Sequence, residues 1–254
     1  MKVYYFTATG NSLYAAKKIK EGVGECDLIS IPKALKEKKF NVEDTVIGFV
    51  YPIHCGSLPI VVEDFITKLN IKEKTYIFAI GVTGGGKAKV SFSHINELLG
   101  DRGELSNYLC VKYISNYTRS GRNPTKERAL KAIELNEYIL DDFIEVIKKQ
   151  EVKHVDYKDS KKILYKAWKN LFKNKDKAFN VNDKCIGCEM CKSICPVDNI
   201  KMSNSKPIWL GNCTDCMACI NICPKEAINI GNNTLKKNRY RNPFIEVKEL
   251  VYND

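Results

Sequence analysis

The residues with the clearest chemistry are cysteines that recur in one spacing. The segment "CIGCEMCKSICP" runs from Cys185 to Pro196, and "CTDCMACINICP" runs from Cys213 to Pro224. In each run two residues separate the first three cysteines, and the fourth follows after three residues, directly before a proline. Eight of the eleven cysteines belong to these runs. Because thiolates ligate metals, such a cluster indicates a metal site rather than a disulfide scaffold.

This spacing is typical of iron–sulfur clusters, and the fourth cysteine of such a run binds the cluster of the other run. Three thiolates of one turn can converge on one face of a cubane, whereas a single loop does not easily reach the fourth corner. We therefore predict two [4Fe-4S] clusters with crossed ligands. Cluster I is predicted to bind Cys185, Cys188, Cys191 and Cys223, and cluster II to bind Cys213, Cys216, Cys219 and Cys195. The alternative is structural zinc, whose sites have four ligands but not this crossed, duplicated spacing with prolines.

The likeness of the two runs continues beyond the cysteines, since "CPVDNIKM" matches "CPKEAINI". Over about 50 residues the sequence resembles the dicluster bacterial ferredoxins. This resemblance implies a small α+β domain in which two short hairpins and helices are related by a pseudo-twofold axis.

A second group of polar residues follows the first apolar segment, in "YYFTATGNS". A helix that begins here would offer backbone N–H groups and a favourable dipole to an anion, and Gly10 would let the backbone approach it. The Walker lysine and the G-x-G-x-x-G pattern are both missing, which disfavours a nucleoside triphosphate and a dinucleotide. Hydroxyls and an amide suit a terminal phosphate monoester. The candidate phosphate-binding residues are Thr7, Thr9, Gly10, Asn11 and Ser12.

Strand-like and helix-like segments alternate over residues 1–150 and must position this loop. The strand candidates are residues 2–6, 27–31, 44–51, 75–82 and 109–115. The helix candidates are residues 12–22, 60–69, 89–99 and 124–150. Such alternation predicts an α/β fold with a doubly wound parallel sheet of five strands. Ligands of such sheets bind outside the carboxyl ends of the strands.

Two further loops follow predicted strands, "YPIHCGSLP" at 51–59 and "GVTGGGKA" at 81–88. With the phosphate loop and the alternating pattern, they make residues 1–150 resemble the flavodoxins, in which these positions flank the flavin ring. The resemblance implies FMN as the cofactor. Besides the phosphate loop, it implies contacts from Tyr51, Pro52, Ile53, His54, Gly56, Thr83, Gly84, Gly85 and Gly86.

Other residues near these loops leave alternatives open. His54 stands where related flavin loops have tyrosine, and it could donate a proton or have no catalytic role. Cys55 could be a redox thiol, but it has no CxxC partner. Asn116, Tyr117 and Arg119 follow the last predicted strand, and one of them could contact the flavin. We assign no catalytic residue from the sequence.

After residue 150 the pattern changes to a basic connector at 151–182, followed by the cysteine-rich domain and its tail at 183–254. Leu164, Trp168 and Leu171 share one stripe of a connector helix, which is expected to dock on a neighbouring domain. The complete chain resembles the flavodoxin–ferredoxin fusions of the EFR1 type.

That resemblance implies a function in electron transfer, between two [4Fe-4S] clusters and FMN and onward to a redox partner protein or a small acceptor. The alternative is an FMN-dependent reductase of a quinone, nitro compound or similar acceptor, with the clusters as its electron wire. A redox sensor is a third possibility. The sequence does not decide between carrier and enzyme, nor does it set the oligomeric state.

The composition excludes other classes of function. The formal net charge is +11, and the basic excess is densest in the connector, with nine basic and four acidic side chains. No nucleic-acid-binding fold accompanies this charge, so it indicates a solvated face and no nucleic-acid partner. No apolar run approaches 18 residues, so no membrane span is expected. The N-terminal segment lacks signal-peptide features, which favours a reducing cytoplasm where thiolates stay available to metals.

Overall fold

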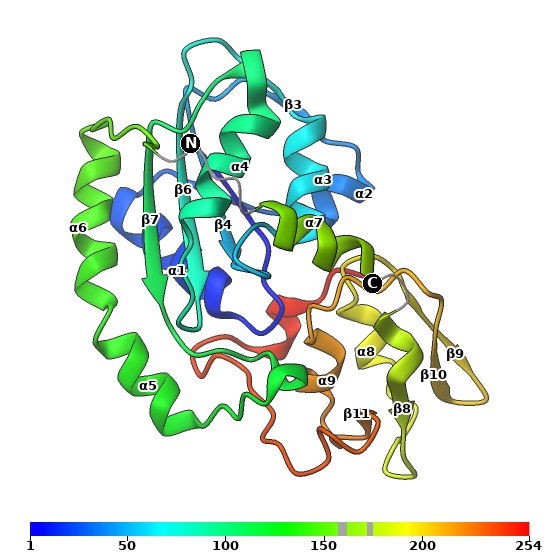
Figure 1. Ribbon diagram of the computed structural model, residues 1–254. Coiled ribbons are helices and arrows are strands. Elements are labelled where there is room, and N and C mark those ends of the chain that lie inside the picture. Colours follow the sequence, from blue (N-terminus) through cyan, green and yellow to red (C-terminus); the bar gives the residue numbers. More distant parts are fainter. Residues whose placement is uncertain (157–161, 172–174, 254) are drawn as a thin grey trace.

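The computed structural model describes residues 1–156, 162–171 and 175–253, with only the helical backbone at 162–164 and 171. A large α/β part and a small cysteine-rich part lie against each other, and the carboxyl ends of the long strands point toward the small part (Figure 1). Within these residues no helix has the length and apolar character to span a membrane.

The large part is built on one parallel sheet, in the order β2-β1-β4-β6-β7. The strands are β1 (Lys2–Tyr5), β2 (Asp27–Ser30), β4 (Val46–Pro52), β6 (Tyr76–Thr83) and β7 (Asn107–Lys112). Counted along the chain, this is the 2-1-3-4-5 order of the flavodoxin-like doubly wound fold. The predicted five-stranded parallel sheet is therefore confirmed.

Both faces of the sheet are covered, because neighbouring residues of a strand point to opposite sides. Val3 and Val50 belong to a core shared with α1 (Asn11–Val23) and α6 (Glu137–Lys148). Tyr4 and Phe49 belong to a second core shared with α2 (Ile31–Lys36), α3 (Ile60–Lys68) and α4 (Lys89–Leu99). All eight residues of β6, at the centre, are buried, as expected for a parallel strand covered on both faces.

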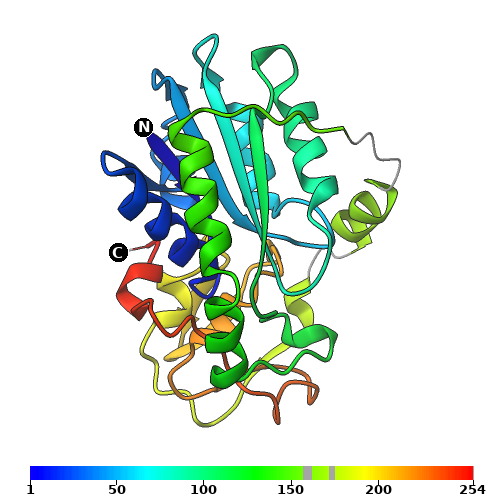
Figure 2. The same cartoon turned by 90° about the vertical axis from the view of Figure 1, so that its left-hand side faces the viewer.

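The helix predicted over 124–150 is two helices, α5 (Lys126–Glu134) and α6. The break falls at Asn136, whose φ of −120° is not helical and whose side-chain amide donates to the Ala132 carbonyl at 2.8 Å. Asparagine competes in this way for backbone groups, so it ends helices readily. Below the break, α5 extends past the end of the sheet toward the small part (Figure 2).

The small part contains two antiparallel strand pairs and two short helices, which confirms the predicted ferredoxin-type α+β arrangement. One pair joins β8 (Phe179–Val181) to β11 (Ile228–Ile230), and the other joins β9 (Ile200–Ser203) to β10 (Lys206–Trp209). The helices are α8 (Met190–Ser193) and α9 (Ala218–Ile222). They occupy equivalent positions in the two cysteine runs.

The remaining elements connect or border these two parts. They are the pair β3 (Asn41–Val42) and β5 (Asn70–Ile71), the connector helix α7 (Lys162–Leu171), and the 3-10 turns η1 (Gly100–Arg102), η2 (Thr118–Ser120), η3 (Lys175–Ala178) and η4 (Val247–Leu250). We call residues 236–253 the C-terminal tail. From the small part, the tail returns to the first helix and the loop before it.

Candidate cofactor sites

We call residues 6–10, between β1 and α1, the phosphate loop; α1 begins at Asn11 directly after Gly10. The first N–H groups of a helix have no acceptor within the helix, and they lie at the positive end of its dipole. The Ser12 hydroxyl is buried and has no hydrogen-bond partner within the described part of the chain. A buried unpaired hydroxyl is unfavourable unless a ligand satisfies it. The loop therefore fits a group with several acceptor oxygens, such as a phosphate.

Two of the candidate phosphate-binding residues have another role in the structure. The Asn11 side chain accepts hydrogen bonds from Tyr240 Oη at 2.6 Å and Asn242 Nδ2 at 3.0 Å and donates one to the Ile114 carbonyl at 3.3 Å, so it is engaged within the protein. Gly10 has a φ of +101°, and a Cβ built on it would lie 2.9 Å from Asn242 Cβ. Its lack of a side chain therefore admits the C-terminal tail.

A cavity of about 350 Å³ opens at the carboxyl ends of the strands, where the fold class places its ligands. The predicted residues that line it are Thr7, Thr9, Asn11, Ser12, Pro52, Ile53, His54, Gly56, Thr83, Gly84 and Gly86. Three predicted residues are not part of the lining: Gly10, Tyr51 and Gly85.

Tyr51 is buried in the core on the α4 side of the sheet, where its hydroxyl lies 3.0 Å from Ser91 Oγ. The alternation along β4 directs its ring away from the cavity. Gly85 lies in a turn that Thr83 closes, since Thr83 Oγ1 accepts hydrogen bonds from the N–H groups of Gly85 and Gly86 at 3.2 and 2.8 Å. The Thr83 hydroxyl therefore shapes the glycine-rich loop.

Part of the lining was not predicted from the sequence. Ser115 ends the strand predicted at 109–115, and it lines the cavity with Asn116 and Tyr117, two residues that the sequence left as possible flavin contacts. Arg119, considered with them, does not line the cavity. Three further residues come from distant segments that carried no signal for a cavity contact: Trp168, Asp215 and Cys216.

His54 lies in a tight turn held by two backbone hydrogen bonds with Ser57, at 3.0 and 2.9 Å. Burial, with a smaller contribution from the Lys175 charge, lowers the pKa of His54 to about 4. The imidazole is therefore neutral at neutral pH. Partial burial raises the pKa of the neighbouring Cys55 thiol, which is the opposite of what an activated redox thiol needs.

The connector helix α7 is fixed to α3 through one carboxylate. Tyr165 Oη donates to Glu63 Oε2 at 2.6 Å, and Lys169 Nζ lies 2.8 Å from Glu63 Oε1. The Tyr165 ring stacks on the Trp168 ring at 5.7 Å, and Trp168 lines the cavity beside His54. The predicted packing of Leu164 and Leu171 lies outside the described side chains.

The eight cysteines of the two runs line two small cavities in the small part. One is lined by Cys185, Cys188, Cys191 and Cys223. The other is lined by Cys195, Cys213, Cys216 and Cys219. Each cavity thus combines three cysteines of one run with the fourth of the other. Over the residues described, no three His, Cys, Asp or Glu side chains are grouped as a single-ion site.

The two runs share their backbone conformation as well as their spacing. Left-handed φ values recur at equivalent positions, Gly187 with Asp215, Glu189 with Met217 and Asp198 with Glu226. In both runs the sulfur of the fourth cysteine accepts a hydrogen bond from the amide four residues on, Asn199 N to Cys195 Sγ at 3.2 Å and Ala227 N to Cys223 Sγ at 3.3 Å. Hydrogen bonds to cysteine sulfur are one means by which proteins set cluster potentials.

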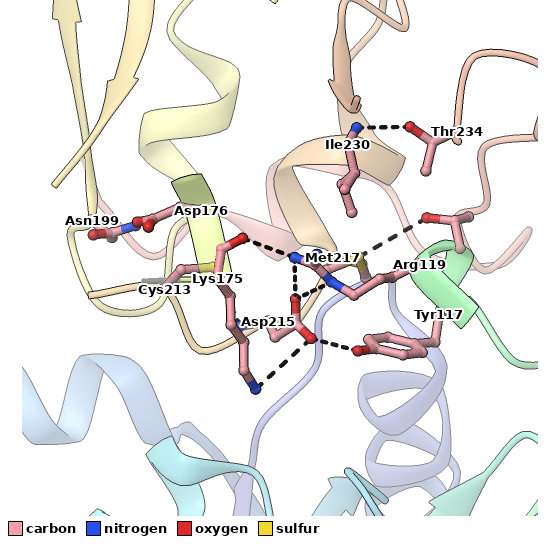
Figure 3. Close-up of polar contacts among 11 residues, drawn as sticks. Tyr117, Arg119, Lys175, Asp176, Asn199, Cys213, Asp215, Met217, Ile230 and Thr234 are labelled. Carbon is pink, nitrogen blue, oxygen red and sulfur yellow. Dashed lines mark hydrogen bonds and ion pairs between the residues drawn. The ribbon is translucent and has the colours of Figure 1, made fainter. Parts of the chain in front are cut away.

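At Asp215 the second run meets the large part (Figure 3). Its side chain is fully buried and accepts hydrogen bonds from Tyr117 Oη at 2.5 Å and Arg119 Nε at 3.0 Å. Lys175 Nζ lies 3.8 Å from the same carboxylate and 3.4 Å from the centre of the Trp168 ring. A buried charge requires such partners, so this network fixes the second run against the cavity.

Only the second run reaches the large cavity. Asp215 and Cys216 line it together with the phosphate loop, and Cys216 also lines the second cysteine cavity. The cysteines of the first cavity do not line it. Among them Cys188 is exposed, and Ile186 beside it is 61% exposed. The two cysteine cavities thus differ, one adjoining the large cavity and one reaching the surface.

Comparison with known proteins adds one family match. Residues 184–228 match the family of the 4Fe-4S dicluster domain. No curated protein sequence matches the chain.

Several solved structures are similar to the chain. A flavoprotein in complex with FMN from Lactobacillus acidophilus is 14% identical, with a TM-score of 0.34 over 43% of this chain and 91% of that one. The two-electron reduced flavodoxin of Megasphaera elsdenii is 20% identical, with a TM-score of 0.36 over 45% and 88%. An azoreductase from Bacillus anthracis is 14% identical, with a TM-score of 0.34 over 56% and 100%. The fold assignment itself rests on the strand order of this chain.

The strand order and the dicluster match define the class of protein, a redox protein that joins a flavodoxin-like α/β fold to an iron–sulfur domain. In this chain the α/β fold comes first and the 4Fe-4S dicluster domain follows it. That is the architecture of a flavodoxin–ferredoxin fusion.

Proposed function

We propose that this chain transfers electrons between two [4Fe-4S] clusters and one FMN, and exchanges them with a redox partner. The observation that carries the proposal is the shared cavity, which is lined both by residues of the phosphate loop and by Asp215 and Cys216. A flavin held there would adjoin the residues proposed to hold cluster II. The boundaries proposed for the three segments, at residues 150 and 182, remain those predicted from the sequence.

The residues present fit both kinds of cofactor. The phosphate of FMN would be held by the first amides of α1 and by the Ser12 hydroxyl, and its ring by the loop around His54, the glycine-rich loop after β6 and the indole of Trp168. The two sets of four cysteines fit the crossed ligation of two cubanes. Burial raises the pKa of the Cys216 and Cys219 thiols, and a bound metal deprotonates such thiols outright.

The arrangement supports an order of transfer. Cluster I, with the exposed Cys188, would exchange electrons at the surface, and cluster II would connect it to the flavin. When bound, FMN supplies a centre that takes one or two electrons, whereas each cluster takes one at a time. The chain would thus convert between one-electron and two-electron carriers.

The reductase alternative is favoured by one observation. Ser120 and Arg122 line the same cavity and come from the turn after β7, so they could contact a small acceptor beside the flavin. Against this, a cavity of about 350 Å³ is at the low end for ligand sites, and one flavin would occupy much of it.

The test begins with protein purified without oxygen, from which iron, sulfide and acid-released flavin are counted. We expect two four-iron clusters and one FMN per chain. Stopped-flow reduction should then show cluster bleaching followed by flavin reduction within one chain. Recovery of zinc, or of FAD, would contradict the cofactor assignment. Rapid turnover with quinones or nitro compounds, combined with slow exchange with redox proteins, would favour the reductase.

A further inference from the structure

The C-terminal tail makes a set of buried hydrogen bonds to the phosphate loop that no feature of the α/β fold requires. Asn242, fully buried, donates its backbone N–H to the Thr9 carbonyl at 2.7 Å and its side-chain amide to Asn11 Oδ1 at 3.0 Å. Tyr240 Oη donates to the same Asn11 oxygen at 2.6 Å. The loop is thus held from outside the domain to which it belongs.

Tyr240 also bonds to α9, the helix of the second cysteine run. Tyr240 N donates to Asn221 Oδ1 at 3.0 Å, and Asn221 lies on α9 between Cys219 and Cys223. The Asn221 amide in turn donates to the Asn116 carbonyl at 3.2 Å, on the cavity wall.

The far end of the tail repeats this double attachment. Tyr252 Oη donates to the Thr7 carbonyl, and Tyr252 N donates to the Ser193 carbonyl at 2.9 Å. Beside it the Asn253 amide donates to the Cys195 carbonyl at 3.0 Å. A single buried tyrosine therefore connects the start of the phosphate loop to the helix that precedes Cys195.

The fit between tail and loop leaves little freedom. A Cβ at Gly10 would lie 2.9 Å from Asn242 Cβ, closer than Cβ atoms approach, and 3.0 Å from Ile245 Cβ, tighter than most such contacts. The loop conformation that presents the α1 amides is therefore defined partly by the tail. Because the tail is also bonded to α8 and α9, its position depends on the structure of the cysteine runs.

We infer that the C-terminal tail positions the phosphate loop for the flavin phosphate and couples phosphate binding to the integrity of the clusters. Tyr240, Asn242 and Tyr252 are positioning residues, since they act through Asn11, Thr9 and Thr7. Coupling between two sites is reciprocal, so a bound phosphate should also protect the clusters. This inference rests on the proposed function, because it assumes FMN in the large cavity.

The experiment compares FMN with riboflavin, which has the same ring but lacks the phosphate. Flavin-depleted chains with intact clusters are titrated, and binding is followed by flavin fluorescence. Tyr252→Phe removes only the hydroxyl that bonds to Thr7. We expect it to weaken FMN binding about five- to tenfold, the equivalent of one hydrogen bond, and to leave riboflavin binding unchanged. Asn242→Ala should act in the same direction, and Tyr138→Phe, at a side chain that is 63% exposed, is the matched control.

The coupling is tested by the loss of cluster absorbance to an iron chelator. FMN should slow this loss in the unaltered chain more than riboflavin does, and Tyr252→Phe should abolish the difference. Equal weakening of both ligands, or unchanged FMN affinity in both Tyr252→Phe and Asn242→Ala, would overturn the inference. If the unaltered chain binds neither flavin, the proposed function itself fails, which is a distinct outcome.

Discussion

The carboxylate of Asp215 lies 2.9 Å from the guanidinium of Arg119, in a pair that joins the second cysteine run to the turn after β7. Asp215 occupies the position that Gly187 occupies in the first run, with a similar left-handed backbone, φ +59° against +68°. Glycine adopts this conformation freely, and aspartate is among the few other residues that tolerate it. Aspartate at this position therefore gives the second run a contact near the cavity that glycine cannot give the first run.

Removing the charge of Asp215 is expected to disturb this contact. Asp215→Asn keeps the shape and the backbone preference but leaves Arg119 and Lys175 beside a neutral group. We expect the free energy of unfolding to fall by about 3 kcal/mol, as for a broken buried pair, and cluster-to-flavin transfer to slow. Urea unfolding and stopped-flow reduction measure the two effects.

Glu189→Gln is the matched control for Asp215→Asn. Glu189 lies in the first run, and its ion pair with Lys192 is half exposed. Its removal should change the free energy of unfolding by less than about 0.5 kcal/mol. Equal effects of the two variants would contradict a special role for Asp215.

The crossed ligation predicts that substitution of the fourth cysteine in one run damages the cluster held by the other run. Cys195→Ser should perturb the cluster held by Cys213, Cys216 and Cys219, and Cys223→Ser the cluster held by the first run, because serine oxygen matches iron less well than thiolate does. Paramagnetic NMR of each variant assigns the damaged cluster to its cysteines. Damage by Cys195→Ser confined to the first run would disprove the crossed arrangement.

Ser12→Ala should change two quantities in opposite directions. Without flavin, the variant should be as stable as the unaltered chain or more stable, since a buried unpaired hydroxyl is removed. FMN affinity should fall by about 1.5–3 kcal/mol, the range for a hydrogen bond to a charged group. Ser30→Ala removes another buried unpaired hydroxyl, at the end of β2 and outside the cavity lining, and should leave FMN affinity unchanged.

The contacts of α7 with Glu63 allow a test of the role of Trp168 in lining the cavity. Glu63→Ala removes the acceptor of both Tyr165 and Lys169, so α7 should be held less firmly. We expect FMN affinity to fall about fivefold, which corresponds to roughly 1 kcal/mol, and the tryptophan emission to shift to longer wavelength as Trp168 meets water. Asp64→Ala, which removes an exposed ion pair with Lys68, should do neither.

The low pKa of His54 predicts a pH dependence of stability. In the folded chain the pKa is about 4, against 6.5 for an ordinary histidine, so the unfolded chain takes up the proton first. The free energy of unfolding should fall as the pH decreases from about 6.5 to about 4, by up to about 3 kcal/mol. Urea unfolding of flavin-free protein measures the free energy of unfolding at each pH, for the unaltered chain and for His54→Gln. The clusters contribute equally to both chains, so their contribution cancels when the two values are subtracted. A difference that does not vary with pH would show that His54 is not buried in this way.

The sequence by itself determined the chemistry of the cysteine runs and the fold class. The spacing of Cys185, Cys188 and Cys191 is local, because three ligands on one turn need no distant contact. Alternating strands and helices define a doubly wound sheet through their periodicity alone, and the fold class then locates the ligand site at the strand ends. Even there, the direction of the Tyr51 side chain depended on the register of β4 in the sheet.

Only the tertiary structure decided which run adjoins the cavity and what surrounds the phosphate loop. Gly187 and Asp215 occupy equivalent positions in two similar motifs. The effect of having aspartate there depends on its partners Tyr117 and Arg119, which are about a hundred positions away in the sequence. Tyr252 reaches the Thr7 carbonyl across nearly the whole chain. Such contacts form when complete surfaces pack against each other, so no local period or motif in the sequence marks them in advance.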